Sequence, residues 1–177
     1  MEKRAGTKSA ARKAAILHIV ITVIVMAVIF VHSAMPGDAS TAESDVIVLR
    51  ILKFSGMDHD FVSFLVRKAA HCAVYMVLGG CLMLNVIDLA KRKASRAAGL
   101  DDAWKNAAGL DAAEVEAVRI PLMRTLAWAA GTFYAATDEL HQSFVAGRNG
   151  SLFDVCLDSV GVLVGVAVVW AVSRKRV

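Results

Sequence analysis

The sequence predicts an all-α polytopic membrane protein, with four transmembrane helices and a short interfacial helix in the first outer loop. Hydrophobic residues make up 57% of the 177 positions, above the roughly 45–50% that is usual in soluble domains. Charged residues still reach 20%, and they are concentrated between long apolar segments. A helix needs about 20 apolar residues to cross a hydrocarbon core. The expected spans, all in one domain, are about 14–32, 69–87, 120–137 and 152–172.

Two of these spans differ from a simple apolar transmembrane helix. The third is the least apolar, because it contains Arg124 and many alanines, although an arginine one turn from the start of a span reaches the headgroups. The first has the basic flank of a cleaved signal peptide, with Val31-His32-Ser33 as a passable cleavage site. Its apolar run exceeds the roughly 7–15 residues of a signal-peptide core, so a retained helix is favoured.

Lysines and arginines indicate the orientation in a plasma membrane. The N-terminal tail, the 88–121 segment and the C-terminal tail carry five, six and three of them, against five in the 33–68 and 138–151 loops together. Positively charged loops stay in the cytoplasm. Both termini and a linker loop at 89–119 are therefore expected in the cytoplasm, and the other two loops outside.

The connecting segments carry local signals. Met35-Pro36-Gly37-Asp38 is typical of a turn. Residues 45–54 gather apolar side chains around two cations, as in a short helix lying in the membrane interface. Asp58 or Asp60 is a candidate N-cap for the helix that continues into the second span. The sequence Ala-Ala-Gly-Leu-Asp occurs at 97–101 and again at 107–111, which we interpret as an expanded surface linker.

Several functional classes are disfavoured by composition. The three cysteines all fall in apolar segments, which argues against a disulfide framework, and no Cys-x-x-Cys indicates a zinc site. The basic residues are explained by topology, so nucleic acid is not an expected partner. No His-Glu-x-x-His or other fixed ligand spacing is present. Neither a metal nor a cofactor is therefore expected.

Polar residues within or beside the spans are the candidate functional residues, because a charge at the bilayer centre costs about 2.5–3.5 kcal/mol on insertion scales. They occur at the start of the second span, at the end of the third and at the start of the fourth. With the orientation above, all three groups lie at the outer level and form one outward-facing pocket. The candidate ligand-binding residues are Lys68, His71, Tyr75, Asp138, Glu139, His141, Gln142, Arg148, Asp154 and Asp158.

A structural role for these residues remains an alternative. Paired polar groups hold membrane helices together, and the carboxylates of Asp138 and Glu139 could simply lie in the headgroup layer. Gly161 and Gly165 predict close approach of a neighbouring helix. His18 is expected to be a tolerated interfacial histidine.

The motifs in these groups resemble those of VanZ-like membrane proteins. The similarity extends from the first span through the fourth, and its most specific part follows the third span. One departure is that His32-Ser33-Ala34-Met35-Pro36 stands where the family often has a Ser-Ser pair or Ser-x-Gln-Pro. The matching patterns are Lys68-x-x-His71-x-x-x-Tyr75-x-x-Leu78-Gly79, Asp138-Glu139-x-His141-Gln142-x-Phe144-x-x-Gly147-Arg148 and Asp154-x-x-x-Asp158-x-x-Gly161.

The resemblance implies a role in the cell envelope and a link to resistance against teicoplanin-like lipoglycopeptides. A non-enzymatic binder of membrane lipids, of a lipid-linked cell-wall precursor or of the drug is the preferred hypothesis, with Lys68 and Arg148 meeting phosphate or carboxylate. The alternative is an enzyme, a metal-assisted hydrolase or transferase acting on lipid phosphates. A transporter is less favoured, because four helices enclose little pathway.

Overall fold

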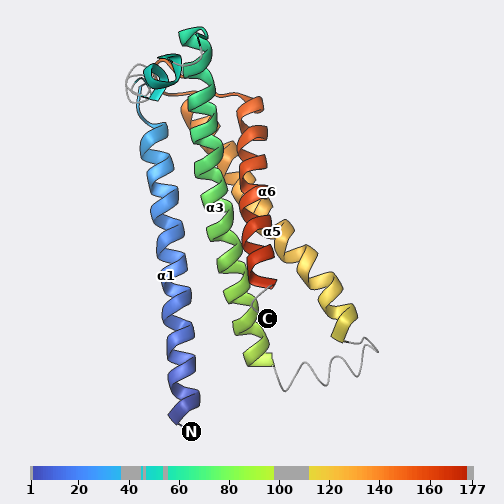
Figure 1. Cartoon of the computed structure of the whole chain (residues 1–177). Helices are drawn as coiled ribbons and strands as arrows, with labels where there is room; N and C mark the ends of the chain where they lie inside the picture. Colours follow the sequence, from blue (N-terminus) through green and yellow to red (C-terminus); the bar gives the residue numbers. More distant parts are fainter. Residues whose placement is uncertain (1, 37–44, 46, 54–55, 98–111, 175–177) are drawn as a thin grey trace.

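The computed structural model describes residues 2–36, 45, 47–53, 56–97 and 112–174, and every regular element within them is helical. The long helices are α1 (Glu2–Ser33), α3 (His59–Ala97), α5 (Ala112–Gln142) and α6 (Leu152–Arg174). They run alternately up and down (Figure 1), so the end of α1, the start of α3, the end of α5 and the start of α6 meet at one end of the bundle. The short helix at 47–53 lies at this end as well.

Within the described residues, three helical segments are long and apolar enough to cross a membrane: Ser9–Ser33, His59–Arg92 and Leu152–Ser173. Many of their large apolar side chains point away from the bundle, among them Leu17, Val23 and Val164. Such a broad exposed apolar surface is unfavourable in water and favourable against lipid tails. The all-α membrane fold expected from the sequence is therefore confirmed in outline. The third expected span, within α5, is not among the three helices.

The helices extend beyond the spans that hydropathy locates. α3 continues to Ala97 and α5 begins at Ala112, so both ends of the linker expected at 89–119 are helical. Alanine, lysine and arginine, which are common there, have high helix propensity, and a helix therefore continues past its apolar part. The Ala-Ala-Gly-Leu-Asp repeat, apart from Ala97, and the turn residues 37–38 lie outside the described residues.

The most extensive packing joins α3 and α6 through glycines. A Cβ atom added at Gly161 would overlap the carbonyl oxygen of Cys72, and one at Gly165 would overlap that of Met76. The close approach predicted for these two glycines is confirmed. Val162, between them, is fully buried and packs against Gly79 of α3 and Gly131 of α5. The α6 backbone is thus in direct contact with the backbone of α3.

α1 contacts the other helices partly through polar groups. The Tyr134 hydroxyl donates to the carbonyl of Met26 at 2.7 Å, and Asn85 donates to the Thr22 hydroxyl at 2.6 Å. Nδ1 of His18 lies 2.7 Å from Oδ2 of Asp88. His18 is therefore more than an interfacial histidine, because antiparallel packing places it level with an acidic residue on α3.

The start of α3 has the capping structure that the sequence predicts. Oδ1 of Asp58 accepts hydrogen bonds from the backbone amides of Asp60 at 2.9 Å and Phe61 at 3.1 Å. These amides have no partner within the helix, and an N-cap carboxylate satisfies them. Asp58, rather than Asp60, is therefore the N-cap.

Replacing Gly165 by alanine should destabilise the bundle by about 1–3 kcal/mol, the usual cost of overpacking. The new Cβ would meet the backbone of Met76, which cannot move without shifting α3. Gly80→Ala is the matched control, because its Cβ would meet the Val169 side chain at 3.2 Å and the Gly165 carbonyl oxygen only at an ordinary contact distance of 3.8 Å. Thermal unfolding in detergent should show a clearly larger loss for Gly165→Ala. Equal losses would contradict backbone contact at Gly165.

Candidate ligand-binding pocket

A pocket of about 380 Å³ opens at the end of the bundle where α3 and α6 begin. The loop that joins α5 to α6 and the short helix at 47–53 also contribute to its wall. Apolar lining comes from Ile47, Phe64 and Leu157. Of the candidate residues from the sequence, those that line it are Lys68, His71, Glu139, Gln142, Arg148, Asp154 and Asp158.

Asp138 lies behind this lining, at the contact between α5 and α1. It is only 3% exposed. Its Oδ2 atom accepts hydrogen bonds from the Ser33 hydroxyl at 2.8 Å and from Nε2 of Gln142 at 3.0 Å. Its Oδ1 atom is buried and has no hydrogen-bond partner among the described residues. Asp138 therefore connects two helices through one oxygen.

The Gln142 side chain connects the two carboxylates of α5 to the following loop. Its Nε2 also donates to Oε1 of Glu139 at 3.1 Å, and its Oε1 accepts from Nη1 of Arg148 at 3.1 Å. The second Glu139 oxygen accepts from the backbone amide of Ser151 at 3.0 Å. Because Gln142 is buried, this arrangement fixes the orientation of its amide.

Arg148 ties the α5–α6 loop to the end of α1. Its Nε donates to the carbonyl of Met35 at 3.0 Å and its Nη2 to that of His32 at 3.3 Å. Burial lowers the pKa of Arg148 below its usual value, while the nearby carboxylates of Asp138 and Glu139 oppose that shift. Arginine remains charged at neutral pH, since its ordinary pKa exceeds about 12.

The facing sides of α3 and α6 carry two further charged pairs. Lys68 forms an ion pair with Asp154 near the pocket opening. Deeper, Nδ1 of His71 lies 3.7 Å from Oδ2 of Asp158, which is longer than a hydrogen bond. Asp158 is 1% exposed, and neither of its carboxylate oxygens has a hydrogen-bond partner among the described residues.

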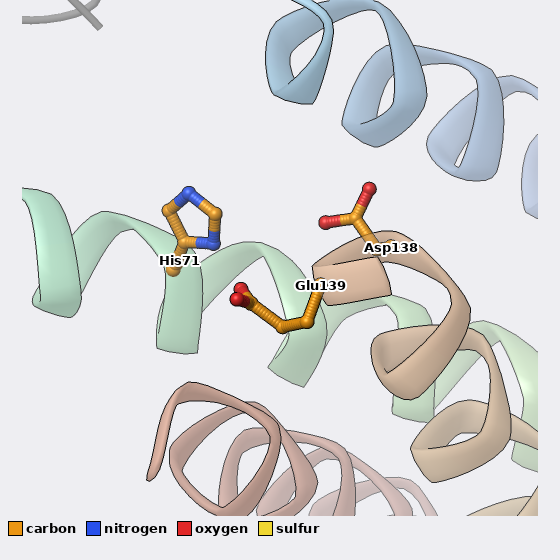
Figure 2. A group of neighbouring side chains, drawn as sticks. All are labelled: His71, Asp138 and Glu139. Carbon is orange, nitrogen blue, oxygen red and sulfur yellow. The ribbon is translucent and has the colours of Figure 1, made fainter. Parts of the chain in front are cut away.

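His71 also faces the carboxylates of α5. Figure 2 shows His71 on α3 and Asp138 and Glu139 on α5 with their side chains directed toward a common space. One possible ligand atom from each residue lies within 4.8 Å of the other two, a grouping that could hold a metal ion. The sequence places these three residues in one pocket but predicts no metal there, because they come from two separate helices and form no local ligand motif.

Besides Asp138, two candidate residues from the sequence do not line the pocket. Tyr75 is fully buried in the helix core, with its ring centroid 6.4 Å from that of Tyr134. His141 points toward α1 and stacks on Phe30, with the ring centroids 4.6 Å apart. The i, i+3 spacing correctly places His141 beside Asp138, but the His141 ring packs on α1 and does not reach the pocket.

Several residues of the site were not singled out from the sequence. His32, Arg67 and Asn149 line the pocket, and Ser33 donates to Asp138. Only proximity to the polar groups marks His32 and Arg67 in the sequence. Ser33 lies in the segment where the sequence departs from the VanZ-like pattern, so its hydroxyl gives that segment a defined contact.

A helical membrane protein with a polar pocket at one end of its bundle is thus the class that the fold and the site define. The chain matches the family model described as VanZ/LLP1 over residues 18–173. It therefore belongs to the VanZ family, and the resemblance seen in the sequence motifs is confirmed. No curated protein and no solved structure gives a significant match.

Arg148→Lys should destabilise the folded chain by about 1–3 kcal/mol, because lysine cannot reproduce the three separate hydrogen bonds of the guanidinium group. Unfolding in detergent, followed by circular dichroism, measures the effect. Arg50→Lys is the matched control, because Arg50 is exposed and should tolerate the change. A loss no larger than that of the control would show that the Arg148 contacts contribute little.

Proposed function

We propose that this VanZ-family protein acts in the cell envelope by binding the polar headgroup of a lipid, a lipid-linked cell-wall precursor or a lipoglycopeptide. The observation that carries the proposal is the combination of buried carboxylates with basic side chains in one pocket between apolar helices. Lys68, Arg67 and Arg148 offer donors suited to phosphate or carboxylate. The carboxylates of Glu139 and Asp158 suit amines and hydroxyl groups.

The chemistry of the pocket wall supports a ligand that is part lipid. Phe64 and Leu157 contribute apolar surface beside the charged groups, and the outer surfaces of α3 and α6 are rich in exposed apolar side chains. An acyl or isoprenoid chain could lie along these surfaces while its headgroup occupies the pocket. Ligand sites commonly combine apolar walls with a few placed polar groups in this way.

We further propose that α5 is a fourth span and that the pocket faces outward. α5 is 31 residues long and packs against both α3 and α6, which supports a position beside them in the bilayer, antiparallel to both. Near the start of the expected span at 120–137, the Arg124 guanidinium lies 4.4 Å from the ring centroid of Trp170, which stabilises the cation by a cation–π interaction. The excess of lysine and arginine then places both termini inside, and the 47–53 helix in the outer interface.

The family resemblance adds resistance to teicoplanin-like drugs as a specific role. Such drugs act outside the membrane on lipid-linked precursors, which agrees with an outward-facing pocket. A second candidate function is a hydrolase or transferase acting on lipid phosphates. The grouping of His71 with Asp138 and Glu139 favours it, because imidazole and carboxylate groups together supply acid–base or metal chemistry.

Alanine replacement of His71, Gln142, Arg148 or Asp158 should lower teicoplanin protection toward that of cells without the protein, because each change removes a polar contact at the pocket. A susceptibility assay measures this, with immunoblotting of membranes to check the amount inserted. Asp60→Ala is the control, since this carboxylate is on the same outer segment but exposed. Full protection by all four variants at normal abundance would refute the role of the pocket in resistance.

The proposed orientation predicts labelling by a membrane-impermeant maleimide in intact cells. After Cys72, Cys81 and Cys156 are replaced by alanine, Asn149→Cys should react without permeabilisation, because it lies in the expected outer loop. Ser9→Cys should react only after the membrane is opened. The reverse pattern would invert the topology and place the pocket on the cytoplasmic side.

A further inference from the structure

We infer that His71, Asp138 and Glu139 bind a divalent transition-metal cation at the inner side of the pocket. The inference concerns the same pocket as the proposed function and names a cofactor for the second candidate function. Metal uptake is measured without lipid or drug, so the cation site and the headgroup-binding role can fail separately.

The geometry is that of a partly assembled coordination shell. One ligand atom from each of the three residues lies within 4.8 Å of the others. Metal–ligand bonds of about 2.0–2.6 Å allow two ligands of one ion to be at most about 4–5 Å apart. In Figure 2 a carboxylate oxygen of Asp138 points toward the His71 ring, and the Glu139 carboxylate lies below that ring. The three side chains need only small rotations to meet one ion.

The charge balance of the site independently indicates a cation. Asp138, Glu139 and Asp158 are 3%, 5% and 1% exposed, respectively. Oδ1 of Asp138 and both oxygens of Asp158 are buried without hydrogen-bond partners among the described residues. A buried ionised carboxylate is costly unless it is paired or coordinates a metal.

Two nearby basic side chains, those of Lys68 and Arg148, make their hydrogen bonds and ion pairs with groups other than these three carboxylates. Lys68 forms its ion pair with Asp154, and Arg148 donates to Gln142 and to two backbone carbonyls. A protonated His71 would offset only one of the three carboxylates. A divalent cation would offset two charges and allow His71 to remain a neutral ligand.

The surrounding hydrogen bonds orient the proposed ligands. Ser33 and Gln142 orient the Asp138 carboxylate through Oδ2, while Oδ1 has no hydrogen-bond partner among the described residues. The Ser151 amide and Gln142 hold the Glu139 carboxylate, whose oxygens each retain a further lone pair. Partners of this kind fix ligand orientation in metal sites. Asp158, 3.7 Å from Nδ1 of His71, adds a further negative charge beside the proposed ligands.

The donor set indicates which metals fit. Imidazole nitrogen suits zinc, iron and other late first-row ions, whereas carboxylates suit manganese, magnesium and calcium. One histidine with two or three carboxylates matches Zn²⁺ or Mn²⁺ better than Mg²⁺ or Ca²⁺, which prefer oxygen alone. His71 and Glu139 line the pocket, so a phosphate oxygen of a headgroup could complete the coordination.

Metal binding by the purified full-length chain in detergent tests the site. After EDTA treatment and its removal, Mn²⁺ is titrated and followed by electron paramagnetic resonance, and Zn²⁺ uptake is measured by elemental analysis after gel filtration. We expect about one ion per chain for at least one of the two metals. Asp138→Asn and Glu139→Gln should each weaken the affinity at least tenfold.

Asp88→Asn is the matched control. It makes the same chemical change in the other histidine–aspartate pair, that of His18 and Asp88, and should leave metal uptake unchanged. Gel filtration and circular dichroism establish that each variant is folded. If Asp138→Asn misfolds, the wild-type chain still tests the site, because a bound metal must raise its unfolding temperature above that in EDTA.

Two outcomes would overturn the inference. One is the absence of stoichiometric uptake of both Mn²⁺ and Zn²⁺ by the folded wild-type chain. The other is an equal loss of uptake in Asp88→Asn, which would mean that the ion binds elsewhere or non-specifically. If Mn²⁺ binds, nitrogen coupling in its pulsed resonance spectrum should identify His71 as a ligand and should disappear in His71→Ala.

Discussion

Three buried carboxylates at one end of the bundle constrain the rest of this structure. Asp138, Glu139 and Asp158 come from two helices that are otherwise largely apolar, and each needs a partner because its charge is removed from water. The chain supplies those partners from every neighbouring element: Ser33 from α1, His71 from α3 and the amide of Ser151 from the last loop. The end of the bundle is therefore closed by polar contacts rather than by apolar packing.

Glycine packing between α3 and α6 sets the geometry of this polar end. The α6 backbone at Gly161 contacts the carbonyl of Cys72, and these two positions are close in sequence to Asp158 and His71, respectively. Because the backbones meet there, the imidazole and the carboxylate are held opposite each other. Larger residues would separate the helices and widen this part of the pocket. The glycines thus act on the site without touching a ligand.

The two ends of the bundle use polar residues differently. Away from the pocket, His18 and Asp88 form a single close pair at 2.7 Å, one base to one acid. In the pocket, His71 faces three carboxylates, and the side chains of Lys68 and Arg148 contact Asp154, Gln142 and backbone carbonyls. The first arrangement is self-contained and joins helices. The second has capacity for a ligand, which distinguishes a candidate site from a structural network.

The sequence by itself determined the helical membrane class, the family and most of the titratable side chains that line the pocket. Apolar segments of spanning length can form only helices or closed barrels in lipid, and i, i+3 and i, i+4 spacing brings polar residues such as Lys68 and His71 to one helix face. The tertiary structure decided which faces meet. In the fold, His141 stacks on Phe30 and Tyr75 is buried. The Ser33 hydroxyl joins the site, and His18 pairs with Asp88. It also assembled His71 with Asp138 and Glu139, because helix rotation and tilt depend on contacts between distant segments that no local pattern encodes.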